Sequence, residues 1–385
     1  MNILFLMGVY PSWGGVEKVS SVLANELTCR GHKVLIASFE QLSPELAQSE
    51  LHPDVSLFPL SLPVWSENNK RKLKQIIRDN EIDILINQWC VPFYVAKLCQ
   101  TAIQGTSCRL VSVHHNLPST NARIKNLEIK IDKKEYVALN HCKLSVVRLV
   151  SRLSLLYTYS RSDVFIVLSP SFVPILAKFI HASDTSKIRA IPNPITIENS
   201  LVNLQEKERE IIYVGRIEYN QKRTFRIIEI WEDLHPMFPD WKLTIVGDGP
   251  DRVDLENRIN QTGLKNISIE GFQNPLPYYQ RSSILLLTSE YEGFPLVLAE
   301  SMSNGVIPVV LDSFSSAHDI INNQESGIIV SYPYSKKEFV EKLSVLMQNL
   351  EYRTNMAQEA IRSSSKFSLE HVIQYWETLF KDLLL

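Results

Sequence analysis

The sequence predicts an α/β fold made of two Rossmann-like, doubly wound domains, each with a parallel β-sheet and helices on both faces. The length of 385 residues exceeds the size at which one hydrophobic core stops growing, which favours two domains of roughly 180 residues. Short apolar runs alternate with helical patterns almost throughout the chain. The content of 45% hydrophobic and 21% charged residues is ordinary for a globular protein. Two such domains imply a central cleft that both of them face.

The predicted strands are short apolar runs bounded by polar or glycine residues, which are typical of strands buried on both faces of a parallel sheet. In the first half they span Ile3–Met7, Val34–Ala37, Ile82–Ile86, Leu110–Val113 and Val164–Leu168. The second half repeats the pattern over Ile211–Val214, Leu243–Val246, Ile267–Ile269, Ile284–Leu287 and Val306–Leu311. Each half therefore predicts its own doubly wound sheet.

A proline-rich and charged stretch from Ile191 to Glu208 marks the domain boundary, because proline blocks regular structure and charges favour solvent. We therefore predict a first domain over residues 1–195 and a second over 196–367. The segment 368–385 has apolar residues at helical spacing, so it forms a closing helix that needs a surface to cover it. We expect that surface on the first domain.

The helix that follows the first strand has apolar residues at helical spacing from Val16 to Leu27. It stops before Gly31, a residue suited to the left-handed conformation that ends many helices. The first segment, Met1–Met7, has no basic leader and no small-residue cleavage site, so we interpret it as a buried strand rather than a signal peptide.

Charge and cysteine content narrow the class of protein. The net charge of −2 gives no global attraction to nucleic acid, so we expect no nucleic-acid partner. No apolar run approaches the roughly 18 residues that span a bilayer. The five cysteines form no C-x-x-C pair, which favours reduced, buried thiols. We expect a cytoplasmic chain that can also work at the inner face of the cell membrane.

Loops that follow predicted strands are candidates for ligand binding, because ligands of open α/β sheets lie beyond the carboxyl ends of the strands. Gly14 and Gly15 precede a helix whose free N–H groups would favour a phosphate; the alternative is that they only permit a tight turn. Arg216 and Lys222 follow the strand Ile211–Val214 and could neutralise a diphosphate. The alternative for this pair is an ordinary solvated loop.

The strongest candidate loop runs from Thr288 to Glu300 after a buried strand. Pro295 suits the first helical position and Gly305 the residue past the end, which predicts a helix over about 295–304. Glu292 then precedes the helix and Glu300 lies inside it, with a rise of about 7.5 Å from Pro295 to Glu300. Their carboxylates can accept bonds from sugar hydroxyls; the alternative is two exposed helix residues.

The main-chain N–H groups at the start of this helix add a third kind of contact. Those of Gly293, Phe294 and Leu296 are free to face phosphate or sugar oxygens, because the first N–H groups of a helix have no partner within it. A buried strand followed by carboxylates and free N–H groups favours a site for a phosphorylated sugar.

Adjacent histidines, His114 and His115, follow the strand Leu110–Val113. Neighbouring side chains on a strand point to opposite sides, and no acidic cluster completes a metal site with recognisable spacing. We interpret His114 as a polar contact to substrate and leave open which of the two histidines faces it. No Asp-x-Asp metal clamp occurs, so we expect no metal ion and no cofactor.

With these motifs assembled, the chain resembles the retaining glycosyltransferases of family 4, also described as glycosyl transferases group 1. The resemblance runs through nearly the whole length. Its specific parts are Gly14-Gly15-Val16-Glu17, Val113-His114, Ile191-Pro192-Asn193-Pro194, Val214-Gly215-Arg216 with Lys222, Val246-Gly247-Asp248-Gly249-Pro250, and Glu292 with Glu300. The resemblance implies the GT-B fold, in which two Rossmann-like domains face one another.

The resemblance also implies roles for individual residues. Arg216 and Lys222 would hold the diphosphate of a nucleotide sugar, Glu300 the ribose, and Glu292 with the Gly293-Phe294-Pro295-Leu296 backbone the transferred sugar. Phe272 and Gln273 would lie beside the base, and His114 would contact the sugar from the first domain. The second domain would then bind the nucleotide sugar and the first the acceptor.

The implied reaction transfers a hexose or N-acetylhexosamine, with a UDP-sugar preferred over a GDP-sugar, and retains the anomeric configuration. No carboxylate is an evident nucleophile for a double displacement. We therefore expect attack on the same face, in which the departing phosphate takes the acceptor proton while Arg216 and Lys222 stabilise its charge.

Acceptor contacts are expected in the first domain, where Trp13, Gln88 and Trp89 follow predicted strands and could stack on or bind a sugar. The segment 121–161 has nine Lys or Arg against three Asp or Glu, interleaved with apolar residues. It could rest on an anionic membrane that holds a lipid-linked saccharide acceptor. The alternative is a pair of core helices with solvated basic faces.

Other functions stay open at this point. A sugar-nucleotide epimerase would convert the donor without an acceptor, and a starch or glycogen synthase would extend a glucan. A non-catalytic sugar-nucleotide sensor would bind the donor without turnover. An NAD-dependent dehydrogenase is disfavoured, since no loop has its glycine fingerprint.

Overall fold

The computed structural model describes residues 1–43, 45, 49–197 and 202–385. The chain forms two compact units, Met1–Thr196 together with Leu369–Leu385, and Ile197–Ser368. The limits predicted from the sequence differ from these by one residue at each connection. We describe each unit by itself.

The first unit contains a seven-stranded sheet in the order β3-β2-β1-β4-β5-β6-β7, and all neighbours are parallel. The strands are β1 Asn2–Val9, β2 Lys33–Glu40, β3 Ser56–Pro59, β4 Ile84–Asn87, β5 Arg109–His114, β6 Val164–Val167 and β7 Ile188–Ala190. The order reverses between β1 and β4, which is the topological switch point of a doubly wound sheet. The predicted parallel architecture is confirmed for this unit.

The described helices of this unit connect successive strands, except for the C-terminal helix. They are α1 Gly15–Cys29, α3 Glu67–Asp79, α4 Phe93–Ile103, α5 Ala122–Asp132, α6 Val137–Arg161, α7 Phe172–Ile180 and α15 Leu369–Leu384. The helix α3 begins where the Ser66 side chain accepts a hydrogen bond from the Asn69 N–H, as the free donors of a helix start require. The helix α1 ends before Gly31, which has a φ of 84° as expected for a left-handed end.

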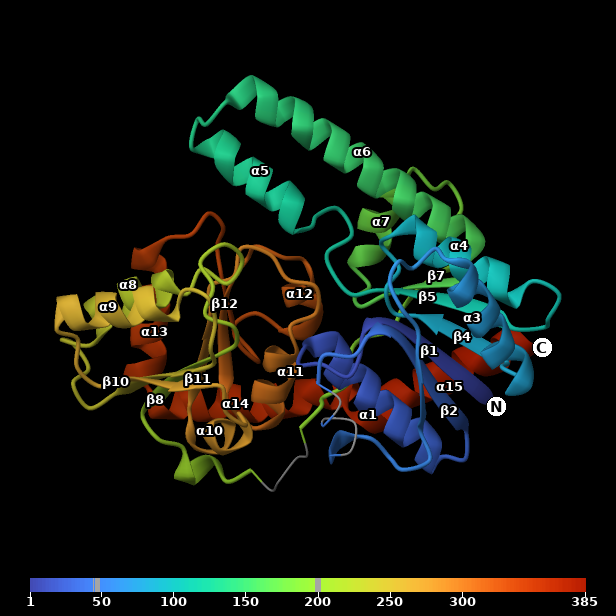
Figure 1. Cartoon of the computed structure of the whole chain (residues 1–385). Helices are drawn as coiled ribbons and strands as arrows, with labels where there is room; N and C mark the ends of the chain where they lie inside the picture. The colour runs from blue at the N-terminus through green and yellow to red at the C-terminus, as the bar shows by residue number, and fades with distance from the viewer. Residues whose placement is uncertain (44, 46–48, 198–201) are drawn as a thin grey trace. The chain divides into compact units, whose positions relative to one another are not determined.

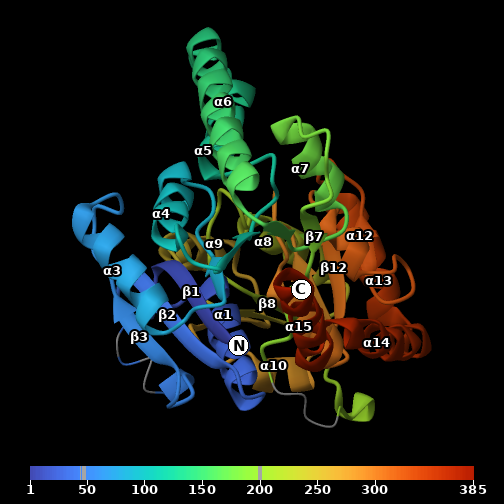
Figure 2. The same ribbon diagram turned by 90° about the vertical axis from the view of Figure 1, so that its right-hand side faces the viewer.

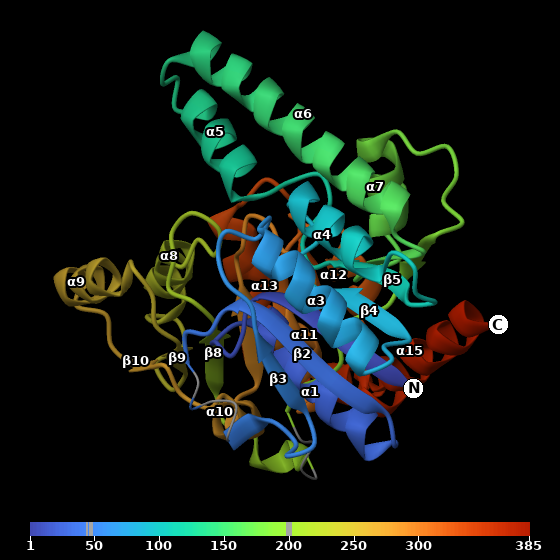
Figure 3. The same cartoon turned by 45° about the vertical axis from the view of Figure 1, so that its right-hand side comes forward.

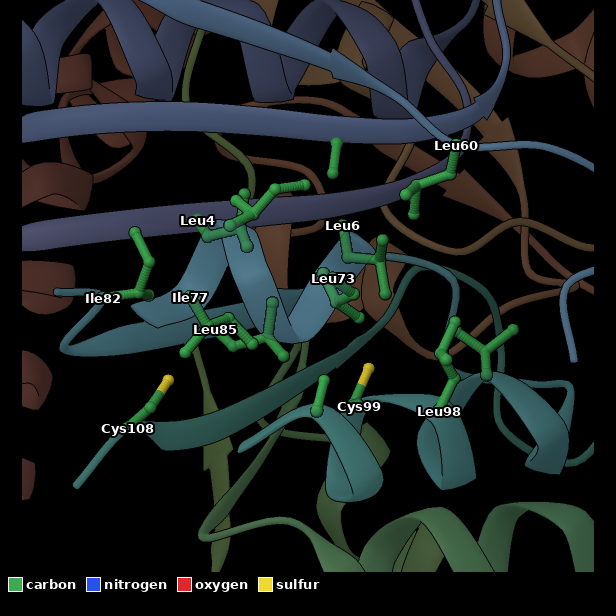
Figure 4. Close-up of a cluster of buried hydrophobic side chains, with 14 of the residues drawn as sticks. Leu4, Leu6, Leu60, Leu73, Ile77, Ile82, Leu85, Leu98, Cys99 and Cys108 are labelled. Atoms are coloured by element: carbon green, nitrogen blue, oxygen red, sulfur yellow. The ribbon is translucent and has the colours of Figure 1, made fainter. Parts of the chain in front are cut away.

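Alternate residues of the central strand pack on opposite faces of the sheet. Leu4 and Leu6 of β1 belong to an apolar cluster formed with α3 and α4 (Figure 4). Ile3 and Phe5, which alternate with them, are equally buried. This pattern requires helices on both faces and explains why the predicted strands have continuous apolar runs.

The C-terminal helix α15 belongs to the first unit, beside α1 (Figure 3). Its apolar residues Val372, Ile373, Trp376, Leu379 and Phe380 are buried. Arg30, at the end of α1, forms ion pairs with Glu370 and Glu377 of α15. The closing helix and the surface predicted for its apolar stripe are therefore observed.

The helices α5 and α6 lie side by side and project from the rest of the first unit (Figure 2). The segment predicted to be basic and amphipathic thus forms a helical hairpin. Leu144 and Leu155 of α6 are buried, whereas Val146 and Leu149 are exposed. Neither alternative from the sequence describes the whole segment, because one face of α6 packs on the protein and the opposite face does not.

The second unit contains a six-stranded sheet in the order β10-β9-β8-β11-β12-β13, again with parallel neighbours (Figure 1). The strands are β8 Glu210–Val214, β9 Lys242–Val246, β10 Ile267–Gly271, β11 Ile284–Leu287, β12 Ile307–Leu311 and β13 Ile328–Val330. The α-helices are α8 Phe225–Leu234, α9 Arg252–Thr262, α10 Leu276–Arg281, α11 Leu296–Ser303, α12 Ser316–Ile320, α13 Lys336–Gln348 and α14 Leu350–Ser364. Short 3₁₀ turns span Leu204–Glu206 and Ser365–Phe367. The switch point of this sheet lies between β8 and β11.

All the predicted strands exist, with boundaries that shift by at most three residues. The strands β3, β7 and β13 were missing from the sequence prediction. Each lies at an edge of its sheet and has only three or four residues. β3 and β7 lack the continuous apolar run that identified other strands, as edge strands can because they pair on one side only. The apolar run of β13 has only three residues.

Two other properties of the chain follow from the described residues. In this part of the chain, no helix combines the length and the apolar character needed to cross a membrane. All five cysteines are free thiols. Cys90, Cys99 and Cys108 are buried as predicted, but Cys29 and Cys142 are exposed because they lie on the outer faces of α1 and α6.

Candidate functional site

The first candidate site lies at the carboxyl edge of the sheet in the second unit. The strands β8 and β11 are neighbours, so the loops that follow them meet at the switch point. Main-chain bonding fixes this meeting, since the Glu290 N–H donates to the Gln221 carbonyl over 2.7 Å. The two loops with the strongest sequence signals are therefore brought together.

Lys222 and Glu292 form an ion pair across these two loops, with 2.6 Å between the Nζ and Oε1 atoms. The Glu292 side chain is only 7% exposed and that of Lys222 is 21% exposed. The Gln221 amide lies 3.5 Å from the second oxygen of Glu292 and donates to the Tyr291 carbonyl. The carboxylate is thus held in one orientation by neighbours from the loop after β8.

Two arginines hold the same pair of loops behind Lys222. Arg223 and Arg226 both form ion pairs with Glu290, and the Arg226 guanidinium also donates to the Thr288 carbonyl. Burial lowers the pKa of Arg226, and the Glu290 carboxylate opposes that effect. These contacts order the backbone that presents Glu292.

Arg216 lies exposed at the start of the loop, above a buried tyrosine. The Tyr213 hydroxyl donates to the Arg216 carbonyl over 2.7 Å, and burial raises the pKa of Tyr213 well above its ordinary value. The phenol therefore stays protonated and fixes the loop backbone. The guanidinium is left at the surface, where it can reach a ligand.

Close backbone packing supports this loop from the neighbouring strand. Gly247 has a φ of 151°, and a Cβ atom there would lie 1.9 Å from the Gly215 carbonyl oxygen. A Cβ at Gly249 would lie 2.1 Å from the Ile217 carbonyl oxygen. The glycines after β9 are thus required by contact with the Arg216 loop.

The helix α11 places Glu300 behind this loop. The structure makes Pro295 the N-cap residue, with ψ at 110°, so the helix begins at Leu296 rather than at Pro295 as predicted. Glu300 is only 5% exposed, and its Oε2 accepts a bond from the Tyr279 hydroxyl over 3.3 Å. The prediction that Glu292 precedes the helix and Glu300 lies inside it is correct.

The loop before α11 is anchored at two points. The Ser316 hydroxyl donates to the Gly293 carbonyl over 2.6 Å. The Phe294 ring packs edge to face against Phe367 at 5.2 Å between centroids. These two contacts hold in place the backbone that carries the first N–H groups of the helix. N–H groups held in this way can bind an anion at a helix start.

Phe272, the other donor residue implied by the resemblance, follows β10 and its side chain is 64% exposed. Gly271 before it has a φ of 74°, and its carbonyl accepts from the Gly247 N–H. The loop after β10 is therefore hydrogen-bonded to Gly247, and Gly247 packs against the Arg216 loop. Gln273 beside it is also exposed.

The second candidate site lies at the carboxyl edge of the sheet in the first unit. His114 ends β5 and is 3% exposed, with Nδ1 at 3.5 Å from the Cys90 sulfur. Burial lowers the pKa of His114 to about 4, which a contact with the Leu117 backbone partly offsets. The imidazole is neutral at pH 7, and its Nε2 has no hydrogen-bond partner among the described residues.

His115 points elsewhere and bonds to Gln88, with 2.6 Å between Nε2 and Oε1. Burial and the neighbouring His114 lower its pKa to about 3. Gln88 is buried, at 6% exposed, and this bond already uses its amide oxygen. The buried Nε2 of His114 is thus without a described partner, whereas the Nε2 of His115 is bonded to Gln88, which favours His114 as the histidine that contacts a ligand.

The tryptophans predicted to contact an acceptor differ in their surroundings. Trp89 packs against the apolar cluster and against Phe39, and a Cβ atom at Gly8 would lie 2.9 Å from its ring. The ring is therefore partly buried and packs against the core beside Gly8 of β1. Trp13 is 60% exposed in the loop before α1.

Gly14 and Gly15 form the start of α1, with Gly14 as the N-cap in an extended conformation. A Cβ atom on Gly14 would lie 2.1 Å from the Glu17 carboxylate. That carboxylate therefore folds back onto the helix start. Burial raises the pKa of Glu17, and a bond to its own backbone opposes this effect.

Several supporting residues were not predicted from the sequence. Tyr213, Gln221, Tyr279 and Ser316 each make a contact described above, but they approach the site from separate elements. The position of Tyr213 in the apolar strand β8 could have predicted that its side chain is buried. The sequence around the other three residues did not indicate that they contact the site. In the ranges that the structure describes, no cluster of three or more His, Cys, Asp or Glu side chains is arranged to hold a metal ion.

Comparison with known families accounts for both units. Residues 13–199 match the family described as Glycosyltransferase Family 4, and residues 197–363 match Glycosyl transferases group 1. The chain belongs to glycosyltransferase family 4. The matched ranges contain His114, Arg216, Lys222, Glu292 and Glu300, and the recognition made from the sequence is confirmed.

Relatives of this glycosyltransferase match it over nearly the full length. The amylovoran biosynthesis glycosyltransferase AmsD of Erwinia amylovora is 26% identical over 384 residues, covering 98% of this chain and 99% of the relative. An N-acetyl-D-galactosaminyltransferase of Campylobacter jejuni that acts on an undecaprenol-diphosphate-linked saccharide is 23% identical, covering 100% and 99%.

Solved structures show the same fold. The HepE protein of Anabaena, in complex with UDP, superposes with a TM-score of 0.75 at 15% identity, covering 99% of this chain and 100% of that one. The lipopolysaccharide outer core galactosyltransferase WaaB superposes with a TM-score of 0.71 at 17% identity, covering 99% and 100%. The two Rossmann-like units of this glycosyltransferase are those of the GT-B fold.

Proposed function

We propose that this glycosyltransferase transfers a hexose or N-acetylhexosamine from a nucleotide diphosphate sugar to a saccharide acceptor, with retention of the anomeric configuration. The observation that carries the proposal is the ion pair of Lys222 with Glu292 at the start of α11, the helix that also contains Glu300. Names of relatives that build surface polysaccharides support the same class of product, a surface polysaccharide or glycoconjugate.

The donor fits this arrangement as follows. The diphosphate lies between Arg216, Lys222 and the free N–H groups at the start of α11, which together supply two positive charges and main-chain donors. Glu292 accepts bonds from the hydroxyls of the transferred sugar, and Glu300 accepts bonds from the ribose hydroxyls. We take UDP as the preferred nucleotide because a structural neighbour is in complex with it, and GDP as the alternative.

The chemistry rests mainly on the leaving phosphate. The bond between the anomeric carbon and the phosphate oxygen breaks, and the acceptor oxygen bonds to that carbon from the same face. The acceptor proton passes to the departing phosphate oxygen, so no protein base is needed. Arg216 and Lys222 stabilise the charge that grows on the diphosphate, and this contribution replaces that of a metal ion.

His114 serves the same reaction as a neutral hydrogen-bonding group. Its lowered pKa keeps the imidazole uncharged at pH 7, and Nε2 has no described protein partner. A buried polar atom without a partner favours binding of a polar ligand atom, because leaving it unpaired costs about 1–3 kcal/mol. We assign this atom to a hydroxyl of the transferred sugar.

The α5–α6 hairpin fits peripheral contact with an anionic membrane from the cytoplasmic side. Val146, Leu149, Val150 and Leu153 form one stripe along α6 and are each at least half exposed. The surrounding segment is strongly basic, so both apolar burial and charge favour an anionic lipid surface. A lipid-linked saccharide acceptor would be reached there.

A panel of nucleotide sugars tests the donor assignment. The native chain is mixed with UDP- and GDP-sugars, and the unfolding temperature and the slow release of nucleotide are measured. A bound donor at 100 times its Kd stabilises the native state by about 2.7 kcal/mol, so one donor should raise the unfolding temperature and be hydrolysed. The Arg216→Ala variant should lose about 100-fold in rate, whereas Lys336→Gln, which removes an exposed cation of the same unit, should not.

The same panel separates the alternatives. An epimerase would produce a new sugar nucleotide without an acceptor, a starch or glycogen synthase would extend a glucan primer, and a sensor would be stabilised by a donor that it never turns over. If no donor raises the unfolding temperature or releases nucleotide, the proposed function fails.

Vesicle flotation tests the membrane contact. The chain should float with vesicles that contain phosphatidylglycerol and not with pure phosphatidylcholine. Replacing Leu149 and Val150 by glutamine should abolish flotation, while Val345→Gln, at an exposed apolar residue of α13, should not. Equal flotation of all variants, or none with the native chain, would exclude the hairpin as a membrane surface.

A further inference from the structure

A cavity lies in the unit 197–368, away from the candidate donor site. It has a volume of about 400 Å³ and is lined by Lys207 and Arg209 before β8, Ser283 before β11, Gly305 before β12, and Arg353 on α14. Glu292 follows β11, so the cavity and the donor site lie at opposite edges of one parallel sheet. The proposed function does not use this cavity.

Three cationic side chains line the cavity, and none of its lining residues is acidic. The Lys207 ammonium group donates to the Tyr279 carbonyl over 2.6 Å. Within the ranges that the structure describes, no carboxylate lies within ion-pair distance of Lys207 or Arg353. Only Arg209 has an acidic partner, Asp240. Buried cations in proteins are usually paired. Arg353 is buried and Lys207 is partly buried, so these two charges, unlike the exposed Arg209, lack a counter-ion among the described residues.

Arg353 contributes a positive charge that is fixed in place. It is 9% exposed, its Nη1 donates to the Leu346 carbonyl over 2.6 Å, and its guanidinium lies 5.0 Å from the centre of the Trp241 ring. Burial lowers the pKa of Arg353, and the charge of Arg209 lowers it further. The charge of Arg209, which is itself paired with Asp240, therefore adds to the positive potential around Arg353.

The acidic groups near Lys207 are engaged elsewhere. Glu210 is buried and accepts bonds from the Arg281 guanidinium and the Thr244 hydroxyl. Glu208 forms an ion pair with Lys242. Glu206 accepts from the Asn203 amide in the adjacent 3₁₀ turn.

The charge state of Lys207 follows from this environment. Burial lowers the pKa of Lys207 to about 7, an effect that Glu210 only partly opposes.

We propose that this cavity binds the phosphate group of a small phosphorylated molecule, held by Lys207, Arg209 and Arg353. One guanidinium group can bind two phosphate oxygens at once, and an ammonium group adds a point charge. The Gln348 amide is a further polar group along the wall, whereas the hydroxyls of Ser283 and Thr354 already donate to main-chain carbonyls. The volume is at the lower end for small-molecule sites, so it admits a sugar phosphate or free phosphate.

Titration calorimetry tests the site with inorganic phosphate at pH 6.5 and constant ionic strength, using the full chain. The native chain should bind phosphate at one site that Lys207→Met weakens at least tenfold. Arg216→Ala and Lys336→Gln should bind phosphate as the native chain does, because Arg216 belongs to the donor site and Lys336 is an exposed cation outside the cavity. Circular dichroism and the unfolding temperature verify that each variant is folded.

Three results would overturn the proposal: no binding to the native chain, unchanged binding by the Lys207→Met variant, or loss of binding in Arg216→Ala alone. The last result would place the phosphate at the donor site. Parallel titration with glucose 1-phosphate distinguishes the sources, since tighter binding than that of phosphate identifies a sugar phosphate and equal affinity identifies the phosphate group alone.

Sulfate provides an independent readout, because its charge does not change between pH 6 and pH 9. An anion favours the charged form of Lys207, so sulfate affinity should be highest below pH 7. Above pH 7 it should fall by up to about tenfold per unit, as proton linkage requires. Lys207→Met should remove this dependence, and Lys207→Arg should restore binding without the pH dependence. A native pH profile as flat as that of Lys207→Met would contradict the assignment.

Discussion

The ion pair between Lys222 and Glu292 joins two residues that the sequence indicated separately. Their residue types and positions after neighbouring strands could be predicted, because parallel strands end at one edge of a sheet. Their direct contact could not, since it depends on how Gln221 and Glu290 align the two loops. Tyr279 had no sequence signal for the same reason, as α10 reaches Glu300 only in the folded unit.

Replacing Lys222 tests the charge assignment. Lys222→Met should lower kcat by about 100-fold or more, because it removes a cation that stabilises the leaving diphosphate in the transition state. The measurement is nucleotide release at saturating donor. Lys336→Gln serves as the matched control and should retain native kcat, and equal rates for both variants would refute the assignment.

The buried histidines predict how stability changes with pH. His114 has its pKa lowered to about 4 in the folded chain, so the unfolded chain binds more protons between pH 6.5 and pH 4. The stability that depends on neutral His114 is present above pH 6.5 and is lost as the pH falls toward 4. The loss is roughly 3 kcal/mol for one such group, and His115 adds to it.

Urea unfolding at several pH values measures this effect. The free energy of unfolding should fall between pH 6.5 and pH 4, and the His114→Gln variant should show a smaller fall. An identical pH dependence in the native and variant chains would show that His114 does not titrate in this way.

At the scale of elements, apolar runs predicted the central strands and the edge strand β10, but missed the other three edge strands. The strands β3 and β7 pair on one side and lack the apolar run that identified β1 or β11, and the run of β13 has only three residues. The helix α11 could be placed to within a residue from Pro295 and Gly305. The division of α6 into a packed and an exposed face needed the tertiary structure, since both faces have apolar residues.

The closing helix α15 provides a stability test. Trp376 is 4% exposed and packs near Phe380, whereas Tyr375 on the same helix is 51% exposed. Trp376→Ala should lower the free energy of unfolding by about 3–5 kcal/mol, because it leaves a cavity in the core. Tyr375→Ala should change it by no more than about 0.5 kcal/mol. Denaturant unfolding measures both, and equal losses would show that α15 is not packed as observed.

At the scale of the whole molecule, the chain starts and ends in the same unit. Residues 197–368 form the second unit between two connections, and α15 then returns to the first unit through Arg30 and the apolar stripe. The sequence indicated this organisation through the repeated strand pattern and the uncovered stripe of the last helix. The candidate donor residues Arg216, Lys222, Glu292 and Glu300 all belong to the second unit, and His114 to the first.

The most direct test of the proposed function is the configuration of the sugar at its anomeric carbon. Proton NMR should follow the slow hydrolysis of the UDP-sugar selected by the panel, within minutes of adding the native chain. The α-anomer should form first from a UDP-α-sugar, because attack occurs on the face that the diphosphate leaves. First formation of the β-anomer would contradict the proposal of a retaining glycosyltransferase.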